Sequence, residues 1–89
     1  MADPIRVHLK TNPQHWVEIK ARWTYADKAA VMESNEPTGV AMLHTVVVAR
    51  NFDAPKDLAE LDDDDGQVII DAIVKARQAQ MGDLLDPNS

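Results

Sequence analysis

The sequence has no cysteine, only three glycines and only four aromatic residues among its 89 residues. Without cysteine, the chain has no disulfide, no thiolate nucleophile and no cysteine-ligated zinc. Three widely spaced glycines do not build a phosphate-binding loop, which needs several glycines within a few residues. These absences exclude several classes of enzyme and direct attention to histidines, carboxylates and exposed surfaces.

Long hydrophobic runs are also missing. No apolar run approaches the ~20 residues that span a bilayer, and the first four residues lack the basic and apolar regions of a signal peptide. We therefore expect a soluble, cytoplasmic chain with one domain over residues 1–82 and a flexible tail over residues 83–89. A domain of this size buries only about 60–65% of its unfolded surface, so we expect a thin core and modest stability, or support from self-association.

Positive charge is scarce and unevenly distributed. The chain carries 9 Lys and Arg against 15 Asp and Glu, which gives a formal net charge of −6. Residues 1–50 hold six basic and five acidic side chains, whereas residues 51–89 hold three and ten. Nucleic-acid binding depends largely on cations that displace counterions, so the acidic second half disfavours it. The expected partner is a positively charged or amphipathic protein surface.

Two alternating segments predict a β-hairpin near the N-terminus. Residues 5–10 place apolar and basic side chains on opposite faces, and residues 16–21 also alternate. Residues 11–14 between them read Thr-Asn-Pro-Gln, which is typical of a turn. Because a two-stranded ribbon alone is marginally stable, we expect it to lie on helices or to pair with another chain.

The next segment predicts a helix that begins after Thr24. Thr24 can cap the helix, and Asp27 three residues later completes a short version of the capping box. Tyr25, Ala29 and Met32 then fall on one narrow apolar stripe, which we expect to face the core. A proline shortly afterwards ends the helix.

Residues 38–49 form the longest uncharged and strongly apolar stretch, and they have two interpretations. The β-branched residues 45–48 suit a buried strand. However, the uninterrupted length from 39 to 50 exceeds a typical strand, and Thr38 is placed to cap a helix. We predict a helix here, with a strand over residues 40–49 as the alternative.

The last third predicts an acidic connection followed by a helix. Residues 51–65 are mostly irregular, with a short helical turn near residues 55–61. Residues 67–81 repeat apolar side chains at helical spacing, and Gly82 is a natural stop. Together these elements predict an α+β fold in which an N-terminal β-hairpin packs on about three α-helices.

Four consecutive aspartates, Asp62 to Asp65, precede Gly66 and resemble part of a calcium loop. If Gly66 is the sixth position of an EF-hand loop, Leu61 is the first and Ala72 the twelfth, so the ligands at both ends are missing. Carboxylates favour the positive end of a helix dipole, and this explains the run better.

The three histidines show no metal pattern. His8, His15 and His44 have no partner at the spacing of a local zinc site. We expect His8 to face solvent, His15 to border the turn and His44 to form the polar edge of a packed helix. Ser34 and Ser89 have no Gly-x-Ser-x-Gly context. We therefore predict no catalytic, cofactor-binding or metal-binding residue, and a protein that is not an enzyme.

The aromatic residues have two possible roles. We expect Tyr25 and Phe52 to anchor the core, as aromatic side chains do in a small domain. Trp16 and Trp23 stay open between core positions and exposed hot spots for a partner.

Two stretches together resemble a known family. Residues 16–20, Trp-Val-Glu-Ile-Lys, precede residues 23–27, Trp-Thr-Tyr-Ala-Asp, and are similar to an opening of the form Trp-Val-Glu-hydrophobic, then Leu-Thr-x-x-Asp/Arg. Residues 46–53, the acidic stretch 58–65 and the helix over 68–74 are similar to an ending of the form Val-Val-x-Trp-Asn-Phe-Thr/Asp, then an acidic loop and a hydrophobic helix.

Both stretches are similar to small proteins from the tail modules of long-tailed bacteriophages and prophages, often described as tail assembly chaperones. The resemblance covers roughly residues 14–80. Two positions depart from the pattern: Arg50 stands where an aromatic residue is expected at a core contact, and the loop after Asp53 lacks an Asp-Gly turn.

The resemblance implies a non-catalytic protein that escorts the tape-measure protein while the tail tube polymerises, in the host cytoplasm if the chain is phage-encoded. An acidic partner with exposed apolar strips suits a long, aggregation-prone helical client. We expect the hairpin edge or the central helix to give the apolar contact, and residues 53–65 to keep the complex soluble. The alternative is a small virion structural protein of the tail or head–tail junction that uses the hairpin for β-augmentation between subunits.

Overall fold

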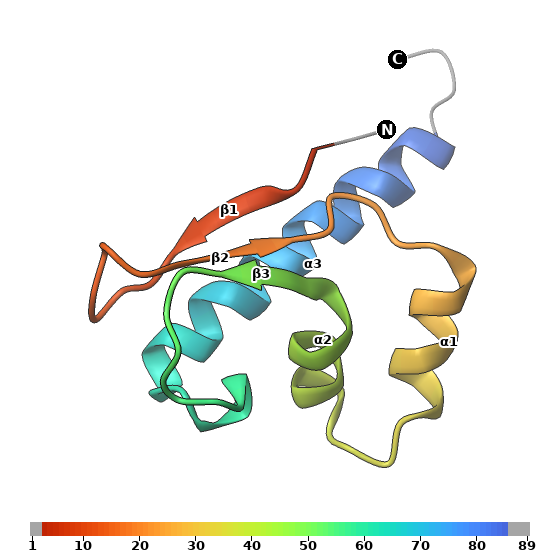
Figure 1. Cartoon of the computed structure of the whole chain (residues 1–89). Coiled ribbons are helices and arrows are strands. Elements are labelled where there is room, and N and C mark those ends of the chain that lie inside the picture. The colour runs from red at the N-terminus through yellow and green to blue at the C-terminus, as the bar shows by residue number, and fades with distance from the viewer. Residues whose placement is uncertain (1–2, 86–89) are drawn as a thin grey trace.

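The predicted N-terminal hairpin is part of a larger antiparallel sheet with strand order β1–β2–β3 (Figure 1). The computed structural model describes residues 3–85. Along the chain, the elements are β1 (Ile5–His8), β2 (Trp16–Ile19), α1 (Tyr25–Glu33), α2 (Thr38–Val46), β3 (Val47–Arg50), the 3₁₀ turn η1 (Leu58–Glu60) and α3 (Asp63–Leu85). The prediction of an α+β fold with an N-terminal hairpin and three α-helices is confirmed.

The register of the hairpin separates a buried face from an exposed one. Val7 lies opposite Val17, and both are buried because residues opposite one another share a face of the sheet. Arg6 lies opposite Glu18 on the other face, where the Arg6 Nη2 and Glu18 Oε2 atoms are 3.3 Å apart. The alternation in the sequence therefore reports correctly which side of β1 and β2 meets the core.

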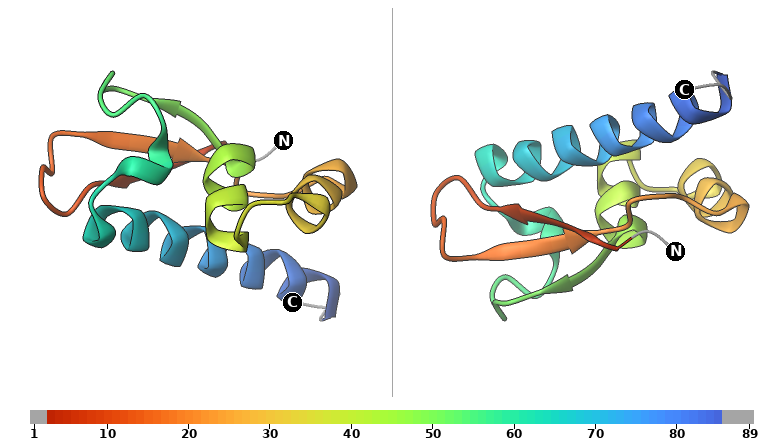
Figure 2. Two further views of the ribbon diagram at one scale, coloured as in Figure 1. Left: turned by 90° about the horizontal axis from the view of Figure 1, so that it is seen from below. Right: turned by 90° about the horizontal axis from the view of Figure 1, so that it is seen from above.

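Helix α3 covers the buried face of the sheet along its length (Figure 2). Ile69 and Ile73 on α3 are fully buried in one cluster with Val17 and Ile19 of β2. Phe52 belongs to the same cluster, which confirms the expected core role of this aromatic residue. Burial of such side chains contributes about 1.5–3 kcal/mol each, so this cluster stabilises the packing of α3 against the sheet.

The central segment is a helix and a strand in succession, so the prediction of one helix is confirmed over residues 38–46 and wrong for residues 47–49. Helix α2 ends at Val46, and Val47 turns to an extended conformation that starts β3. The backbone N–H of Lys20 donates to the Val46 carbonyl at 3.0 Å, and β3 pairs with β2 beyond it. Thr38 is the first residue of the helix rather than its cap, which is Pro37.

The start of α1 is as predicted. The Thr24 side chain accepts a hydrogen bond from the backbone of Asp27, and the Asp27 carboxylate accepts one from the backbone of Thr24. This reciprocal pair is the capping box that the sequence indicates.

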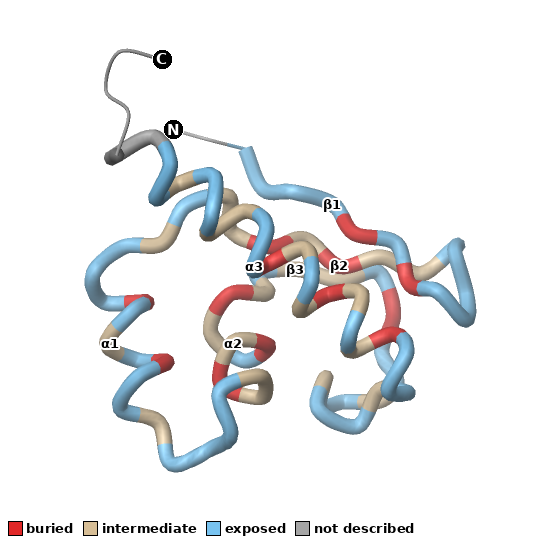
Figure 3. The backbone as a smooth tube through the Cα atoms, turned by 180° about the vertical axis from the view of Figure 1, so that it is seen from behind, coloured by how far each residue is buried: buried red, intermediate tan, exposed pale blue. Residues whose placement is uncertain are grey.

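The face that α1 turns inward is not the predicted one (Figure 3). Tyr25 is 82% exposed and Met32 72% exposed, whereas Asp27 and Val31 are buried. The cause is an ion pair: the Lys20 ammonium at the end of the sheet lies 2.6 Å from the Asp27 carboxylate and draws this side of the helix inward. The apolar stripe and the expected core position of Tyr25 are therefore wrong.

Helix α3 is longer than the sequence predicts. It begins at Asp63 and continues through Gly82 to Leu85, so Gly82 is not a stop. Gly82 does not have the positive φ that a glycine needs to end a helix. Residues 83–85 of the predicted tail are thus helical, and residues 86–89 lie outside the described residues. Between residues 3 and 85, no helix combines the length and the apolar character needed to cross a membrane.

Candidate protein-binding groove

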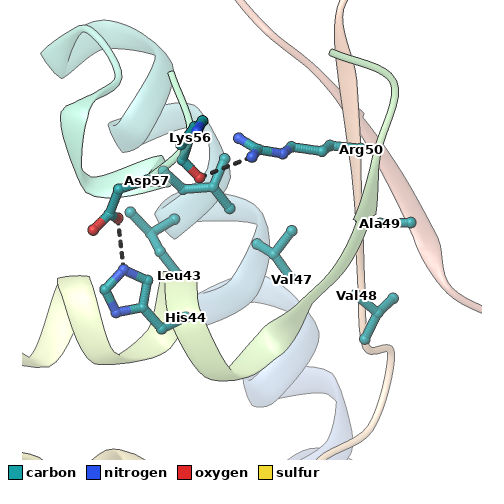
Figure 4. A pocket seen from close by; sticks show the side chains of 9 residues that line it. Leu43, His44, Val47, Val48, Ala49, Arg50, Lys56 and Asp57 are labelled. Carbon is teal, nitrogen blue, oxygen red and sulfur yellow. Dashed lines mark hydrogen bonds and ion pairs between the residues drawn. The ribbon is translucent and has the colours of Figure 1, made fainter. Parts of the chain in front are cut away.

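A groove of about 500 Å³ lies between strand β3, helix α2 and the connection that follows β3 (Figure 4). We call it the β3 groove. Its apolar lining comes from Leu43, Val47, Val48 and Leu58. The polar side chains around it belong to His44, Arg50, Lys56 and Asp57.

Strand β3 forms one edge of the sheet. Between residues 3 and 85, no strand pairs with its outer side. In an antiparallel strand, the backbone groups of successive residues point alternately to the two sides. The Asn51 N–H donates inward to the Trp16 carbonyl at 3.2 Å, and Ala49 faces Glu18 of β2. Arg50, between Ala49 and Asn51, therefore presents its backbone N–H and C=O groups outward, beside the groove. The register shift in the ladder falls at Val48, so this alternation applies to Arg50 and stops before Val48.

Arg50 holds in place the connection after β3, which forms the wall of the groove opposite that strand. Its guanidinium donates to the Pro55 carbonyl at 2.5 Å and to the Lys56 carbonyl at 2.8 Å. The same group lies 5.3 Å from the centre of the Phe52 ring. Figure 4 shows this side chain reaching across from β3 to the connection. The residue that departs from the expected aromatic thus joins the strand to the loop.

His44 holds the same wall from the side of α2. Its Nε2 atom lies 2.6 Å from Asp57 Oδ1, and its Nδ1 atom lies 3.0 Å from Glu36 Oε1. The hydrogen bond with Asp57, followed by that with Glu36, raises the pKa of His44 above its ordinary value. The hydrogen bond from His44, followed by one from the Ala59 backbone, lowers the pKa of Asp57. The imidazole therefore joins the loop before α2 to the loop after β3.

The groove combines apolar surface with charged side chains. Both ring nitrogens of His44 face carboxylates, so each already has a hydrogen-bond partner. Of the described residues that line the groove, none carries a hydroxyl or a thiol. What the groove offers is apolar surface, an open strand edge and charge at its mouth.

The three histidines occupy separate environments. His8 is exposed as expected, and its Nδ1 atom lies 2.8 Å from the Pro13 carbonyl. His15 borders the turn and stacks on Phe52, with 5.0 Å between the ring centres. His44 is the exposed edge of α2 that the sequence predicts. In the part of the chain that the structure describes, no three histidine, aspartate or glutamate side chains are placed to hold a metal ion.

The aspartate run forms the start of α3, as predicted. Its last residue, Asp65, also binds the turn between β1 and β2. Asp65 is only 3% exposed and accepts hydrogen bonds from Lys10 N at 2.8 Å, Thr11 N at 2.9 Å and Thr11 Oγ1 at 2.5 Å. Burial raises the pKa of Asp65, but these hydrogen bonds outweigh burial and leave the pKa below its ordinary value. Asp65 thus anchors the turn between β1 and β2 to α3.

The two tryptophans, left open by the sequence, are both half-buried. The Arg6 guanidinium lies 3.8 Å from the centre of the Trp16 ring on the exposed face of the hairpin. Trp23 packs against the core cluster, and Gln80 of α3 hydrogen-bonds to both its backbone N–H and its carbonyl. Trp16 thus borders solvent, whereas Trp23 joins α3 to the segment before α1.

Comparison of the chain with protein-family models, with curated proteins and with solved structures gives no match.

Proposed function

We propose that this chain is a non-catalytic, tail-assembly-chaperone-like protein that binds the tape-measure protein during phage tail assembly. The observation that carries the proposal is the open edge of β3 beside an apolar groove of about 500 Å³. An unpaired strand edge is a template for another polypeptide, and natural proteins usually cover or blunt such edges. A partner chain is the natural cover here.

The arrangement of the resemblance in space supports this proposal. The Trp-Val-Glu-Ile stretch is β2, and the Val-Val-Ala-Arg stretch is β3, which pairs with it. The two most specific parts of the resemblance therefore form one hydrogen-bonded ladder. Arg50, the departure from the expected aromatic, shapes the wall of the groove on that ladder.

A second observation favours binding over a self-contained fold. Several large apolar side chains are exposed, among them Tyr25 and Met32 on α1 and Val48, 50% exposed, on β3. Exposed apolar side chains on a chain of net negative charge suit a protein that shields an aggregation-prone client and stays soluble itself.

Co-expression with the tape-measure protein of the same phage or prophage tests the proposal. We expect an affinity-tagged chain to retain the tape-measure protein and to raise the fraction of it that stays in the soluble extract. The tail-tube subunit of the same phage, expressed with the same tagged chain, is the control. Soluble tape-measure protein that passes through the column without retention would contradict the proposal.

A small virion structural protein is the second candidate, because the outer side of β1 also has no paired strand among residues 3–85. One sheet with two open edges can join subunits edge to edge. Mass spectrometry of purified particles separates the two candidates. A chaperone is absent from the particle, whereas a structural subunit is present at a fixed copy number.

A further inference from the structure

We infer that β3 binds an extended, basic segment of a partner protein, which adds a fourth strand to the sheet and places an apolar side chain in the β3 groove. The inference rests on the proposed protein-binding function, but it does not depend on the partner being a tape-measure protein. Three features of the described residues carry it: the backbone of β3, the lining of the groove and the charge around its mouth.

The backbone of β3 is arranged to recognise another extended backbone. Arg50 directs its N–H and C=O groups away from β2, and no strand among residues 3–85 pairs with them. Strand addition satisfies such groups with main-chain hydrogen bonds, which give affinity without dependence on the partner's sequence. The Val48 side chain is half exposed, so a neighbouring strand would also bury apolar surface at this position.

The groove supplies preference for an apolar side chain. It lies directly beside the open edge and is floored by Leu43, Val47 and Leu58. Side chains of an added strand alternate between the two faces of the sheet, so every second one would face this floor. A volume of about 500 Å³ accommodates an aliphatic or aromatic side chain with part of its neighbours.

The mouth of the groove supplies preference for positive charge. Segment 53–64 carries six acidic side chains, all exposed, against Lys56 alone. Asp57 lines the groove itself, and Asp62 and Asp63 line a neighbouring hollow of about 240 Å³ that shares Leu43 and Leu58 with it. The Arg50 guanidinium is already engaged by two carbonyls. The six acidic side chains of segment 53–64, which we call the acidic rim, outnumber the two basic side chains that line the groove, Arg50 and Lys56.

The same charge argues against a second copy of this chain as the occupant. Each copy carries a net charge of −6, and edge-to-edge pairing of two β3 strands would bring two acidic rims together. Like charges in apposition oppose association. A basic partner segment gains from the same field.

Binding of a fluorescently labelled peptide that alternates lysine and valine tests the inference with the full chain. We expect saturable binding that weakens as salt is raised, and binding at least about tenfold weaker for the matched glutamate–valine peptide. Two N-methylated forms of the lysine–valine peptide locate the contact. Methylation of alternate amides in one register removes the N–H groups that face β3 and should abolish binding, while methylation in the other register should leave it unchanged.

A pair of variants at one position places the contact on β3. Arg50→Pro and Arg50→Gln both remove the guanidinium, but only Arg50→Pro also removes the outward backbone N–H, at an edge position that tolerates proline. Binding to Arg50→Pro should therefore be about tenfold weaker than binding to Arg50→Gln. If Arg50→Pro does not fold, as judged by circular dichroism, the two N-methylated peptides decide alone.

Three outcomes would overturn the inference: equal binding of the lysine and glutamate peptides, equal effects of the two methylation registers, or no binding at all. Sedimentation that shows a dimer of Arg50→Gln and a monomer of Arg50→Pro would assign the edge to a second copy instead. Retention of the tape-measure protein by Arg50→Pro as well as by Arg50→Gln would leave the proposed function standing while removing strand addition at β3.

Discussion

The turn between β1 and β2 and the connection between β3 and α3 are both joined to a helix by side chains, but in opposite environments. The first is held by Asp65, whose buried carboxylate accepts hydrogen bonds from two backbone N–H groups and a hydroxyl. The second is held by His44, which is exposed, and by the half-buried Arg50. A hydrogen bond in a low-dielectric interior is stronger than one in contact with water, so the first attachment is the firmer one.

This difference matters because the weakly held connection is the wall of the β3 groove. Surface ion pairs contribute little to stability, since solvent and salt screen them. A wall held in this way can shift to admit a strand without unfolding the core. The firm attachment joins the β1–β2 turn to the first turn of α3, a few residues after the weakly held connection ends. The fold thus combines a firmly held turn with a more weakly held wall beside the open edge of β3.

The largest effect is expected when the firm attachment is removed. Asp65→Ala leaves three donors at a buried position without their acceptor and should lower the free energy of unfolding by about 3 kcal/mol. Urea denaturation followed by circular dichroism measures this. Because the folded pKa of Asp65 is lowered, its contribution is present above the ordinary value of 3.8 and is lost as pH falls through the folded pKa.

Asp64→Ala is the matched control for this prediction, because Asp64 is the exposed neighbour on the same helical turn. We expect this variant to stay within about 0.5 kcal/mol of the parent chain. Equal losses for the two variants would show that helix-start electrostatics, which both residues share, account for the effect, and that the buried anchor does not.

The sequence predicts the parts of this fold that depend on neighbours along the chain. The alternation of residues 5–10 and 16–21 identifies the hairpin, and the Thr24–Asp27 pair identifies the start of α1. It does not predict which face of α1 turns inward, because that depends on Lys20 of another segment. Likewise, only pairing with β2 decides that α2 stops at Val46, since the following valines suit either state by themselves.

The sequence does not predict the groove either, because the groove depends on contacts between segments that are distant along the chain. Its lining comes from α2, β3 and the connection, and the sequence offers a strand in this segment only as the alternative to a helix. His44 meets Glu36 eight residues before it and Asp57 thirteen residues after it, and neither spacing is a helical or strand repeat. Asp65 is one of four identical neighbours in the sequence, and only the packing of the β1–β2 turn distinguishes it.

A smaller effect is expected at the groove wall itself. Arg50→Gln removes two charge-assisted hydrogen bonds to the carbonyls of Pro55 and Lys56 and should lower stability by about 1–2 kcal/mol. Hydrogen exchange should speed up at the backbone amides of residues 56–60, while the amides of the β1–β2 turn keep their protection. Arg6→Gln is the control, because Arg6 is an exposed arginine that does not touch the wall. Faster exchange throughout the chain would contradict the separation of the two attachments.

The smallest loss of stability is expected when His44 is replaced. Its contribution can be recognised because it depends on pH. Glu36 and Asp57 face its ring, and they raise its folded pKa, so the attachment is complete below the ordinary value of 6.5 and is lost as pH rises through the folded pKa. Relative to the intrinsic exchange rate at each pH, hydrogen exchange at the backbone amides of residues 57–60 should therefore accelerate as pH rises through the folded pKa of His44. Exchange at the amides of the β1–β2 turn should keep its relative rate. His44→Gln should remove this pH dependence and lower the melting temperature by less than Asp65→Ala, because the ring is exposed. An NMR titration that places the pKa of His44 at or below 6.5 would show that the two carboxylates do not hold the imidazolium.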